Sequence, residues 1–388
     1  MRGNKMKVID LFAGCGGFSL GFIQNGFEVT KAVEFDADIA KTYSENHPQT
    51  NIIVDDIANI DNDRHFFEGE ADIVVGGCPC QGFSTAGARI RKDFIEDPRN
   101  YLFKHFLNIV KTVKPKIFIM ENVKGMMTMQ KGEIFREIIT ALSDKEIMDG
   151  EQYHVYYKIL KGIELGIPQK RERLFIVGIK DNEIDFDALL LDTKQKILQS
   201  NGRFFDKVNI KDAIANLPTV SVDGFVNNPK ATTSYEKYLS STTTIISNHI
   251  KTNHSKKAVE RMRKIGNGEN FTSLDETIKS VHSGAYGRLC WDEVAPTITT
   301  RFDTPAGGRF IHPAENRTLS PREAARIQSF PDNFIFVGNK TSVCKQIGNA
   351  VPPKMSFYWA NFAQIVLSQS VNYERAATEE ANETCGAG

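Results

Sequence analysis

The stretch KVIDLFAGCGGFSLGFIQNG, residues 7–26, holds the features that decide the fold. Residues 7–13 are mostly apolar, which predicts a strand buried inside a sheet. Glycines follow at 14, 16 and 17, and residues 18–26 then predict a helix that ends at Gly26. A strand that passes through a glycine turn into a helix is typical of the ligand-binding unit of open α/β sheets, because glycine lets the backbone approach a ligand closely.

The same alternation of apolar strands and amphipathic helices continues to residue 180. Further strands are expected at 28–35, 51–57, 71–78, 116–123, 153–160 and 173–180, and helices at 37–47, 100–114 and 132–144. Short apolar strands between helices predict an α/β fold with a doubly wound, mostly parallel sheet that carries helices on both faces.

The character of the chain changes after residue 180. Residues 181–316 are rich in Asn, Thr, Ser and Lys and show weak periodicity, which predicts a smaller, irregular second domain. Regular patterns return at 317, where Ser320 is a helix N-cap followed by Pro321. We therefore divide the chain into domains at 1–180 and 181–316, a closing segment at 317–369 that returns to the first domain, and a disordered tail at 370–388.

Composition limits the class of protein. The 388 residues are 41% hydrophobic and 25% charged, which is typical of a soluble globular protein. The net charge is zero, so a nucleic-acid partner would need a local basic surface. The six cysteines form no C-x-x-C pair, and we expect no metal site. We see no secretory signal or membrane-length apolar run, and expect a cytoplasmic protein with reduced thiols and no membrane partner.

Acidic residues follow the second and third predicted strands, at Glu34 and Asp56. In open α/β sheets the ligand lies outside the carboxyl ends of the strands. An acid after the second strand suits a ribose diol, and one after the third suits an adenine amino group. The dinucleotide fingerprint would need glycine at position 19, which is Ser19, so a nucleoside cofactor is indicated without the pyrophosphate version of the site.

The segment GGCPCQGFS, residues 76–84, places thiols at the same edge of the sheet. Cys78 suits a small buried hydrophobe, which is the commonest fate of a free cysteine. Cys80 lies between Pro79 and Gly82, in a rigid exposed turn, and is a candidate nucleophile that needs activation. Glu121 at the next strand end could protonate a substrate ring, although a lone Glu there is more often a surface carboxylate.

Two basic segments have competing interpretations. Gln169, Arg171 and Arg173 alternate, so two guanidinium groups could point at one anionic or ring-oxygen target. Taken alone, this segment is better read as a solvated basic edge. The run from Lys251 to Lys264 has six cations and one acid, Glu260. A solvated helix face is the commoner meaning of such a run, and contact with phosphates is the alternative.

In order along the chain, these blocks resemble the DNA (cytosine-5) methyltransferases of the bacterial modification type. The blocks are DLFAGCGGFSLGF, VEFD, DDI, GGCPCQGFS, ENVKG, QKRERLFIVG, RTLSPREAARIQSFPD and QIGNAVPP, which are spread over nearly the whole length of 7–180 and 317–355. The succession of PCQ, ENV and Q-x-R-x-R is highly specific. Residues 181–316 fall where that family keeps its target-recognition domain, and the fold implied is that of the Rossmann-like S-adenosylmethionine-dependent methyltransferases.

The resemblance implies S-adenosylmethionine as cofactor, double-stranded DNA as partner, and a base flipped out of the duplex. Cys80 would add to carbon 6 of cytosine, Glu121 would protonate ring nitrogen 3, and Arg173 with Arg171 would steady the ring oxygen and a nearby phosphate. The implied cofactor-binding residues are Phe12, Gly14, Gly16, Gly17, Glu34, Asp56, Pro79 and Asn349. The implied DNA contacts are Ser84 and Arg89 in a mobile loop at 84–100, Gln169, and Thr297 in APTITTRF.

Other functions stay open on the residues alone. A transfer-RNA cytosine methyltransferase shares the blocks, although CQGFS and the long variable region fit DNA better. A DNA-binding regulator of the same fold would have lost Cys80 or Glu121, and both are present. A nicotinamide dehydrogenase is disfavoured by Ser19. The resemblance further implies protection of DNA from a cognate restriction endonuclease, and we expect a monomer.

Overall fold

The main sheet has seven strands in the order β3-β2-β1-β4-β5-β7-β6. The computed structural model describes residues 5–60, 62–79, 101–240, 243–276, 278 and 283–385. The strands are β1 (Lys7–Leu11), β2 (Glu28–Glu34), β3 (Asn51–Val54), β4 (Ile73–Gly76), β5 (Ile117–Val123), β6 (Tyr153–Lys161) and β7 (Glu172–Lys180). The neighbouring strands β3, β2, β1, β4 and β5 pair in parallel, in that order. Strand β7 runs antiparallel to both β5 and β6. The predicted mostly parallel sheet is confirmed.

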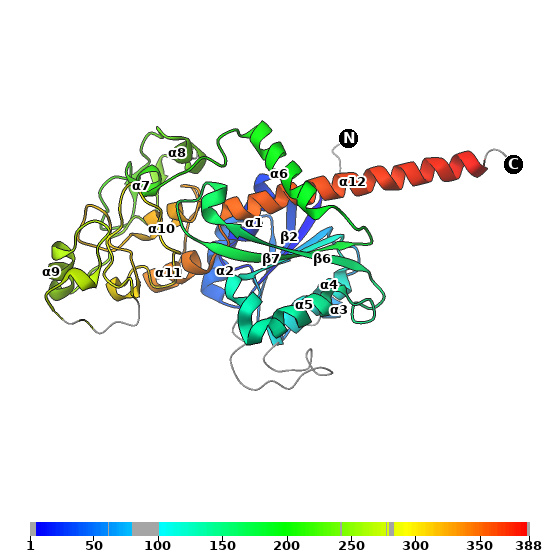
Figure 1. The fold of residues 1–388 in the computed structure, drawn as a ribbon, viewed down its shortest axis with the longest axis horizontal. Helices are drawn as coiled ribbons and strands as arrows, with labels where there is room; N and C mark the ends of the chain where they lie inside the picture. Colours follow the sequence, from blue (N-terminus) through cyan, green and yellow to red (C-terminus); the bar gives the residue numbers. More distant parts are fainter. Residues whose placement is uncertain are drawn as a thin grey trace.

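Helices cover both faces of this sheet, as predicted. Figure 1 shows α6 and α12 on one side of the strands and α3, α4 and α5 on the other. These helices are α1 (Gly17–Gln24), α2 (Ala37–Asn46), α3 (Asn62–His65), α4 (Tyr101–Val113), α5 (Glu133–Ser143), α6 (Phe186–Ser200) and α12 (Pro353–Cys385). Two short 3-10 helices, η3 (Lys124–Gly132) and η4 (Gly162–Leu165), follow β5 and β6.

Strand β7 shows why the sheet has two cores. Leu174 and Ile176 pack into the core that contains α4 and α5, whereas Phe175 and Val177 pack into the core that contains α1 and α12. Successive side chains of a strand point to opposite faces, and here both faces are apolar. A continuous apolar run in the sequence therefore became a strand buried on both sides.

Helix α6 departs from the prediction that the chain is irregular after residue 180. Asp185 caps it by accepting a hydrogen bond from the Ala188 backbone amide. Leu189, Leu190 and Ile197 are buried in the same core as Trp359 of α12. The cap and this spacing were readable in the sequence. The domain boundaries at 180, 316 and 369 stay predictions, with α6 packed into the sheet core and short elements following it.

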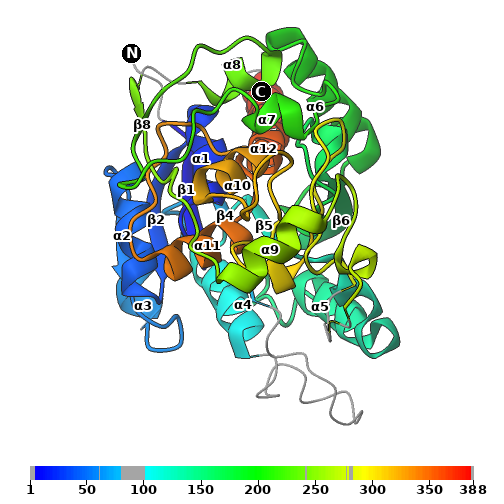
Figure 2. The ribbon, with the colours of Figure 1, turned by 90° about the vertical axis from the view of Figure 1, so that its left-hand side faces the viewer.

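The region after α6 has little regular structure. Its elements are α7 (Ile210–Ile214), β8 (Val226–Asn227), α8 (Ser234–Leu239), β9 (Ile245–Ile246), α9 (Lys256–Lys264) and the 3-10 turns η5 (Phe271–Ser273) and η6 (Pro305–Gly307). The closing segment adds α10 (Pro321–Ile327) and α11 (Lys340–Asn349). Figure 2 looks at the molecule from this end and shows α9, α10 and α11 in front of the strands.

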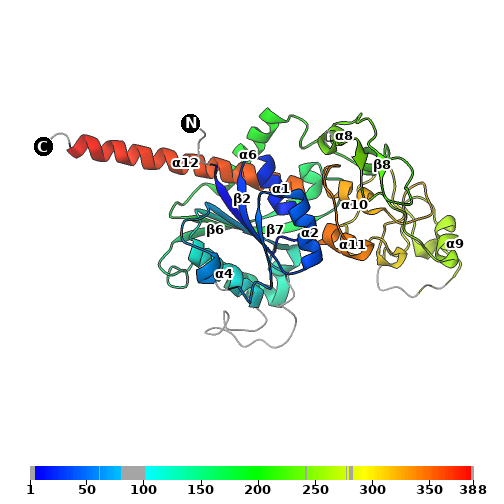
Figure 3. The ribbon, with the colours of Figure 1, turned by 180° about the vertical axis from the view of Figure 1, so that it is seen from behind.

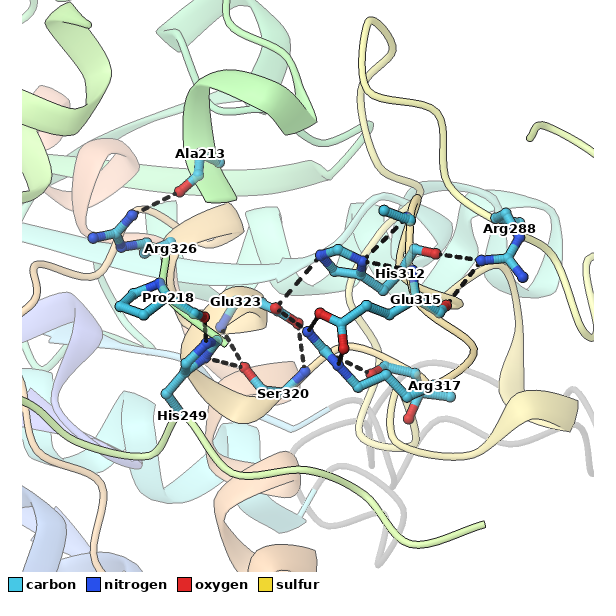
Figure 4. Close-up of polar contacts among 12 residues, drawn as sticks. Ala213, Pro218, His249, Arg288, His312, Glu315, Arg317, Ser320, Glu323 and Arg326 are labelled. Carbon is cyan, nitrogen blue, oxygen red and sulfur yellow. Dashed lines mark hydrogen bonds and ion pairs between the residues drawn. The ribbon is translucent and has the colours of Figure 1, made fainter. Parts of the chain in front are cut away.

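Buried arginines hold this region to the closing segment. The Arg317 guanidinium donates to both Glu315 and Glu323, at 2.8 to 2.9 Å (Figure 4). Glu323 also accepts from the Ser320 backbone amide at the start of α10, and His249 lies 2.9 Å from the Ser320 hydroxyl. The network thus joins the start of α10 to segments from residue 249 onward without a sheet between them.

Helix α12 begins on the face of the sheet that α1 and α6 cover and continues well past it (Figure 1). Its backbone stays helical to Cys385, which extends the helix beyond the predicted start of the tail at 370. Residues 370–384 are rich in Ala, Glu and Asn, and Ala and Glu favour helix. Figure 3 shows that α12 leaves the body on the side opposite α9. Among the described helices, none combines the length and apolar character needed to cross a membrane.

Candidate active site

A cavity of about 550 Å³ opens at the carboxyl ends of the parallel strands. Its volume lies in the range of roughly 300–1,000 Å³ that is usual for small-molecule sites. Its walls come from the turns after β1, β2, β3 and β4, from β5, and from α11 near the end of the chain. The predicted residues that line it are Phe12, Gly14, Glu34, Asp56, Pro79, Glu121, Arg173 and Asn349.

The turn after β1 has the tight geometry that its glycines predict. Gly14 and Gly16 have φ angles of 57° and 91°, a region that favours glycine. Gly16 and Gly17 do not line the cavity. A Cβ at Gly16 would collide with the His47 ring, and one at Gly17 with the Val351 carbonyl. These two glycines therefore let the turn pack closely against α2 and against the closing segment.

Phe12 is held in an unusual backbone conformation at the cavity wall. Its φ angle is 56°, which is uncommon for a residue with a side chain and costs on the order of 1–3 kcal/mol. The backbone amide of the next residue, Ala13, donates to the Val33 carbonyl, and this hydrogen bond fixes the turn. Strain of this kind is retained most often at functional sites.

Glu34 at the end of β2 is buried and bonded to the glycine turn. Its carboxylate accepts hydrogen bonds from the Gly14 amide at 2.8 Å and the Asp36 amide at 3.0 Å. Burial raises the pKa of Glu34, and these amides oppose that rise. Asp56 follows β3 at the cavity wall and accepts from the Ala58 amide at 3.1 Å. The two predicted acids are thus both at the strand edge.

The loop that carries the predicted nucleophile can be followed only to its first residues. Cys80, Ser84 and Arg89 lie outside the described residues. Pro79, the residue before Cys80, lines the cavity. The Asn122 side-chain amide donates to the Cys78 carbonyl at 2.9 Å, which ties this loop to the end of β5. Cys78 is buried in the core, as its position predicted.

Glu121 and Arg173 form an ion pair at the wall of the same cavity. Arg173 Nε lies 2.8 Å from Glu121 Oε1, and both side chains are largely buried. Burial raises the pKa of Glu121, while the charges of Arg173 and Arg171 lower it, and the net shift is upward. A carboxyl with a raised pKa that is held by an arginine is suited to carry a proton to a substrate.

Arg171 and Gln169 do not line the cavity, and both are almost fully buried. The Arg171 guanidinium donates to the carbonyls of Ile298, Gly348 and Ala350, at 2.8 to 3.3 Å. The Gln169 side chain donates to Gln328 and accepts from the Ile298 amide. Of the three alternating residues, only Arg173 reaches the cavity. Arg171 and Gln169 instead hold other segments of the chain in place.

Thr297 lies in the segment that these side chains hold. Its hydroxyl donates to the Lys170 carbonyl at 3.1 Å, and Ala295 exchanges backbone hydrogen bonds with Pro168 and Lys170. Residues 295–298 and 168–171 thus run alongside one another. The irregular region meets the sheet at the point where the strand that carries Arg173 begins.

Helix α11 completes the cavity from the far end of the chain. Asn349 is exposed and lines the wall, as predicted. Lys345 and Gln346 line it as well, and the Lys345 ammonium lies 3.5 Å from Asp36 and over the Phe35 ring. The lining residues that the sequence did not single out include Asp10, Phe35, Asp55, Lys345 and Gln346. Phe35 and Asp55 directly adjoin the predicted acids, and the others lie two to four residues from Phe12 or Asn349, which was the available signal.

Asp10 is fully buried beneath the turn. It accepts a hydrogen bond of 2.6 Å from the Ser19 hydroxyl, which lies 2.7 Å from the Tyr43 hydroxyl. Burial raises the pKa of Asp10 to about 7. A dinucleotide site would have glycine at position 19. Here the Ser19 side chain is used to bind Asp10. In the described part of the chain, no cluster of His, Cys, Asp and Glu has the makings of a metal site.

Comparison with known proteins agrees with this geometry. Residues 6–362 match the family model described as C-5 cytosine-specific DNA methylase. The chain is 33% identical to the type II methyltransferase M.DdeI of Desulfomicrobium norvegicum, over 95% of this chain and 93% of that protein. It is also 33% identical to the type II methyltransferase M1.HphI of Haemophilus parahaemolyticus, over 95% and 88% of the two chains.

Solved structures give the same result. A prophage-encoded E. coli chain assigned as a DNA modification methyltransferase superposes with a TM-score of 0.73 at 28% identity, over 94% of this chain and all of that one. The S. pombe Dnmt2 methyltransferase superposes with a TM-score of 0.60 at 16% identity, over 94% and 99%, which supports the fold alone. The chain belongs to the C-5 cytosine-specific DNA methylase family and is a DNA (cytosine-5-)-methyltransferase.

Proposed function

We propose that the enzyme transfers a methyl group from S-adenosylmethionine to carbon 5 of a cytosine flipped out of duplex DNA, through a covalent bond to Cys80. One observation carries this proposal. The acids predicted for the cofactor, Glu34 and Asp56, line a single cavity with the Glu121–Arg173 pair. A site that must bring a methyl donor and a base together needs both sets of groups around one space.

The residues present fit S-adenosylmethionine. Phe12 and Phe35 offer apolar surface to the adenine, Asp56 can accept from its amino group, and Glu34 can accept from the ribose hydroxyls. The turn at Gly14 brings the backbone to the wall, and Pro79 and Asn349 close the sides. When bound, the cofactor supplies the methyl group. Members of methyltransferase families of this kind generally use this cofactor, and its binding to these residues is our proposal.

The protein side chains divide the chemistry between them. The Cys80 thiolate would add to carbon 6 of the ring, forming a sulfur–carbon bond, while Glu121 gives a proton to ring nitrogen 3. This electron shift makes carbon 5 nucleophilic, so that it can take a methyl group. A water molecule would then take the proton from carbon 5, which expels the Cys80 sulfur as thiolate and restores the aromatic ring, while the nitrogen 3 proton returns to Glu121.

Arg173 has two tasks in this scheme. It fixes the Glu121 carboxyl through its Nε, and its remaining donors can reach the ring oxygen of the base. Arg171 acts through other groups, since its two terminal nitrogens donate to the carbonyls of Ile298, Gly348 and Ala350. We assign Arg171 and Gln169 the task of positioning the segment that carries Thr297 against the strand that carries Arg173.

The DNA partner follows from the family, and further details are proposals. Ser84, Arg89 and Thr297 would contact the duplex near the flipped base. The type II names of M.DdeI and M1.HphI place those relatives in restriction–modification systems. We propose the same setting here, with a monomeric enzyme that protects a site from a cognate restriction endonuclease. A transfer RNA is the alternative substrate that the catalytic blocks alone would allow.

Covalent trapping tests the proposal directly. Purified protein is incubated with labelled S-adenosylmethionine and duplex DNA in which 5-fluorocytosine replaces cytosine. Fluorine cannot leave as a proton, so the reaction should stop with DNA bound covalently to the protein. The expected result is a labelled protein–DNA adduct, and sequencing the trapped DNA gives the recognition site. An adduct that forms only on fluorocytosine-containing transfer RNA would move the substrate to RNA.

The Cys80→Ser variant is the matched control for this experiment. It should bind S-adenosylhomocysteine as the unchanged protein does and yield no adduct. Cys78→Ser, a change in a neighbouring thiol that is buried in the core, should still form the adduct. Turnover retained by Cys80→Ser would contradict the assignment of the nucleophile.

A further inference from the structure

Helix α9 presents a dense group of positive charges to solvent. Lys256, Lys257, Arg263 and Lys264 are exposed, and Lys251 is exposed just before the helix. The other side of the helix is apolar, since Ala258 and Met262 pack in a small core with Tyr286 and Ile311. The sequence had left two meanings for this run, a solvated helix face or a phosphate-binding surface. The contacts of the helix favour the second.

Most of these cations have no ion-pair partner among the described residues, although the charges of Lys257 and Lys264 help to lower the pKa of Glu276. Arg261 forms a two-pronged ion pair with Glu276, with both nitrogen–oxygen distances at 2.7 Å. Across the described residues, Lys256, Lys257, Arg263 and Lys264 form no ion pair within 4 Å of a carboxylate. The net charge of the chain is zero, so this group is a local concentration of positive charge rather than a sample of a basic protein.

The helix is held in a fixed position, which a binding surface requires. The Ser255 hydroxyl caps its start by accepting from the Ala258 amide. Arg288 holds its end, since its guanidinium donates to the carbonyls of Met262 and Ile265. The same guanidinium donates to the carbonyls of His312 and Glu315, beside the Arg317–Glu323 network (Figure 4). The cations thus project from a scaffold that is anchored to the closing segment.

A series of contacts connects this helix to the cavity. His254 Nε2 lies 3.1 Å from the Thr318 hydroxyl, which donates to the Asp303 carbonyl. The Asp303 carboxylate lies 3.7 Å from the ammonium of Lys340, the first residue of α11. Lys345 of that helix lines the cavity. Burial lowers the pKa of His254, and the nearby charges of Lys340 and Lys251 lower it further.

These residues define a basic strip that consists of Lys251, Lys256, Lys257, Arg263, Lys264 and Lys340. We propose that the basic strip binds the phosphate backbone of the DNA duplex beside the flipped base. The inference rests on the proposed function, because it takes duplex DNA as the substrate. Duplex DNA carries one negative charge per roughly 1.7 Å along its axis, so a rigid row of cations is a complementary surface. Contacts of this kind position the duplex and carry no sequence information themselves.

A four-residue variant tests the proposal. It combines Lys256→Gln, Lys257→Gln, Arg263→Gln and Lys264→Gln, all at exposed positions of α9. Binding of a methylatable duplex and of an unrelated duplex is measured by fluorescence anisotropy between 50 and 200 mM salt. Each lost phosphate contact should reduce the slope of log affinity against log salt by about 0.9. We expect the slope to fall by about 2 to 3 and both duplexes to bind roughly 10- to 1,000-fold more weakly at low salt.

The matched control removes the same number of charges elsewhere. It combines Lys145→Gln, Lys158→Gln, Lys161→Gln and Lys194→Gln, which are exposed positions after α5, on β6 and on α6. The control should keep the salt slope of the unchanged protein. Both variants should bind S-adenosylhomocysteine normally, which shows that the cavity is intact.

Two results would overturn the proposal. The α9 variant could match the control in slope and affinity, and the charges would then be a solvated face. The loss could also fall on one duplex alone, which would make α9 a reader of bases. Failure of the unchanged protein to bind or trap any duplex is a different result, because it rejects the proposed function itself.

Discussion

The sheet and the region after α6 are both well packed, but by different means. In the sheet, apolar side chains such as Phe118, Ile119 and Trp359 fill two cores, and strand pairing satisfies the backbone. In the region after α6 and in the closing segment, buried guanidinium groups satisfy backbone carbonyls instead. Those of Arg288, Arg322 and Arg326 donate to backbone carbonyls from distant segments. Among its described residues this region has only the two short strands β8 and β9, so arginines fix it in place of an extended hydrogen-bonded ladder.

Two buried carboxylates, Glu323 and Asp10, have pKa values that are shifted in opposite directions in the two regions. Burial raises the pKa of Glu323, but the hydrogen bonds and charge of Arg317 outweigh it and hold that pKa at about 2. Asp10 receives its hydrogen bonds from the uncharged Ser19, and burial raises its pKa to about 7. The irregular region thus buries a charge with its counter-ion, whereas the sheet region buries an acid that is stable in its neutral form.

The largest expected effect is a fall in kcat on loss of the Glu121 acid, which should leave DNA binding almost unchanged. Glu121→Gln keeps the size of the side chain and removes the acid at the sheet end of the cavity. We expect kcat to fall by about 100- to 10,000-fold, which is the usual contribution of a general acid, with little change in KM for DNA. Steady-state methylation assays measure both quantities. The α9 variant should show the reverse pattern, and an unimpaired kcat in Glu121→Gln would remove its assigned task.

The next effect tests the arginine network. Arg317→Leu leaves Glu323 and Glu315 without their buried partner, and should lower the free energy of unfolding by about 3–5 kcal/mol. The protein has two tryptophans, and Trp291 lies in the irregular region while Trp359 lies in the sheet core. Urea unfolding in a Trp359→Phe background therefore reports on the affected region.

A second change checks the cause of this loss. Replacing both partners, in Arg317→Leu with Glu323→Leu, removes the buried charge and should recover part of the stability. Arg301→Leu, at an exposed arginine, should change stability by less than about 0.5 kcal/mol. Arg317 also donates to the Thr318 carbonyl, and a double variant no more stable than Arg317→Leu alone would mean that this lost contact matters more than the charge.

The pH dependence of stability tests the two carboxylates. The pKa of Asp10 is raised in the folded state, so deprotonation opposes folding, and stability is lost as the pH rises from about 4 to about 7. Asp10→Asn should remove this loss, on the order of 2–4 kcal/mol between pH 4.5 and pH 7.5. Urea unfolding at the two pH values measures it. Glu323 acts in the opposite direction, since its lowered pKa supports folding until the pH falls from about 4.5 toward 2.

The smallest effect concerns the apolar packing of the sheet. A Cβ at Gly178 of β7 would collide with the Phe118 ring of β5. Gly178→Ala should therefore destabilise the protein by about 1–3 kcal/mol through overpacking. Phe118→Leu in the same chain should restore part of the loss, and the Trp359 transition in urea measures both. Equal stability of Gly178→Ala and the unchanged protein would show that the core can shift to make room.

The contrast between the regions also explains what the sequence could predict. The strands and the glycine turn were readable because continuous apolar runs and Gly14 leave local patterns. The cavity residues Glu34, Asp56 and Glu121 followed from the strand ends, and Phe12 followed from the family resemblance. The task of Arg171 was not readable, because its partners Ile298 and Gly348 are more than a hundred residues away and offer only backbone carbonyls. Arginine–carbonyl contacts leave no repeating pattern in the sequence. The sequence could therefore show that this region is irregular, but it could not predict how the region folds.

The cavity is lined by residues that are made early and residues that are made late in synthesis of the chain, so it cannot form until the late ones are present. Its walls need the turn at 12–15 and the residues from Lys345 to Val351. A growing chain on the ribosome can form the early strands but lacks the last wall of the cavity until residues 345–351 have been made. Truncated products that stop before α11 would therefore lack a complete cavity. The same geometry suggests that fragments split in the irregular region could regain activity only when they meet.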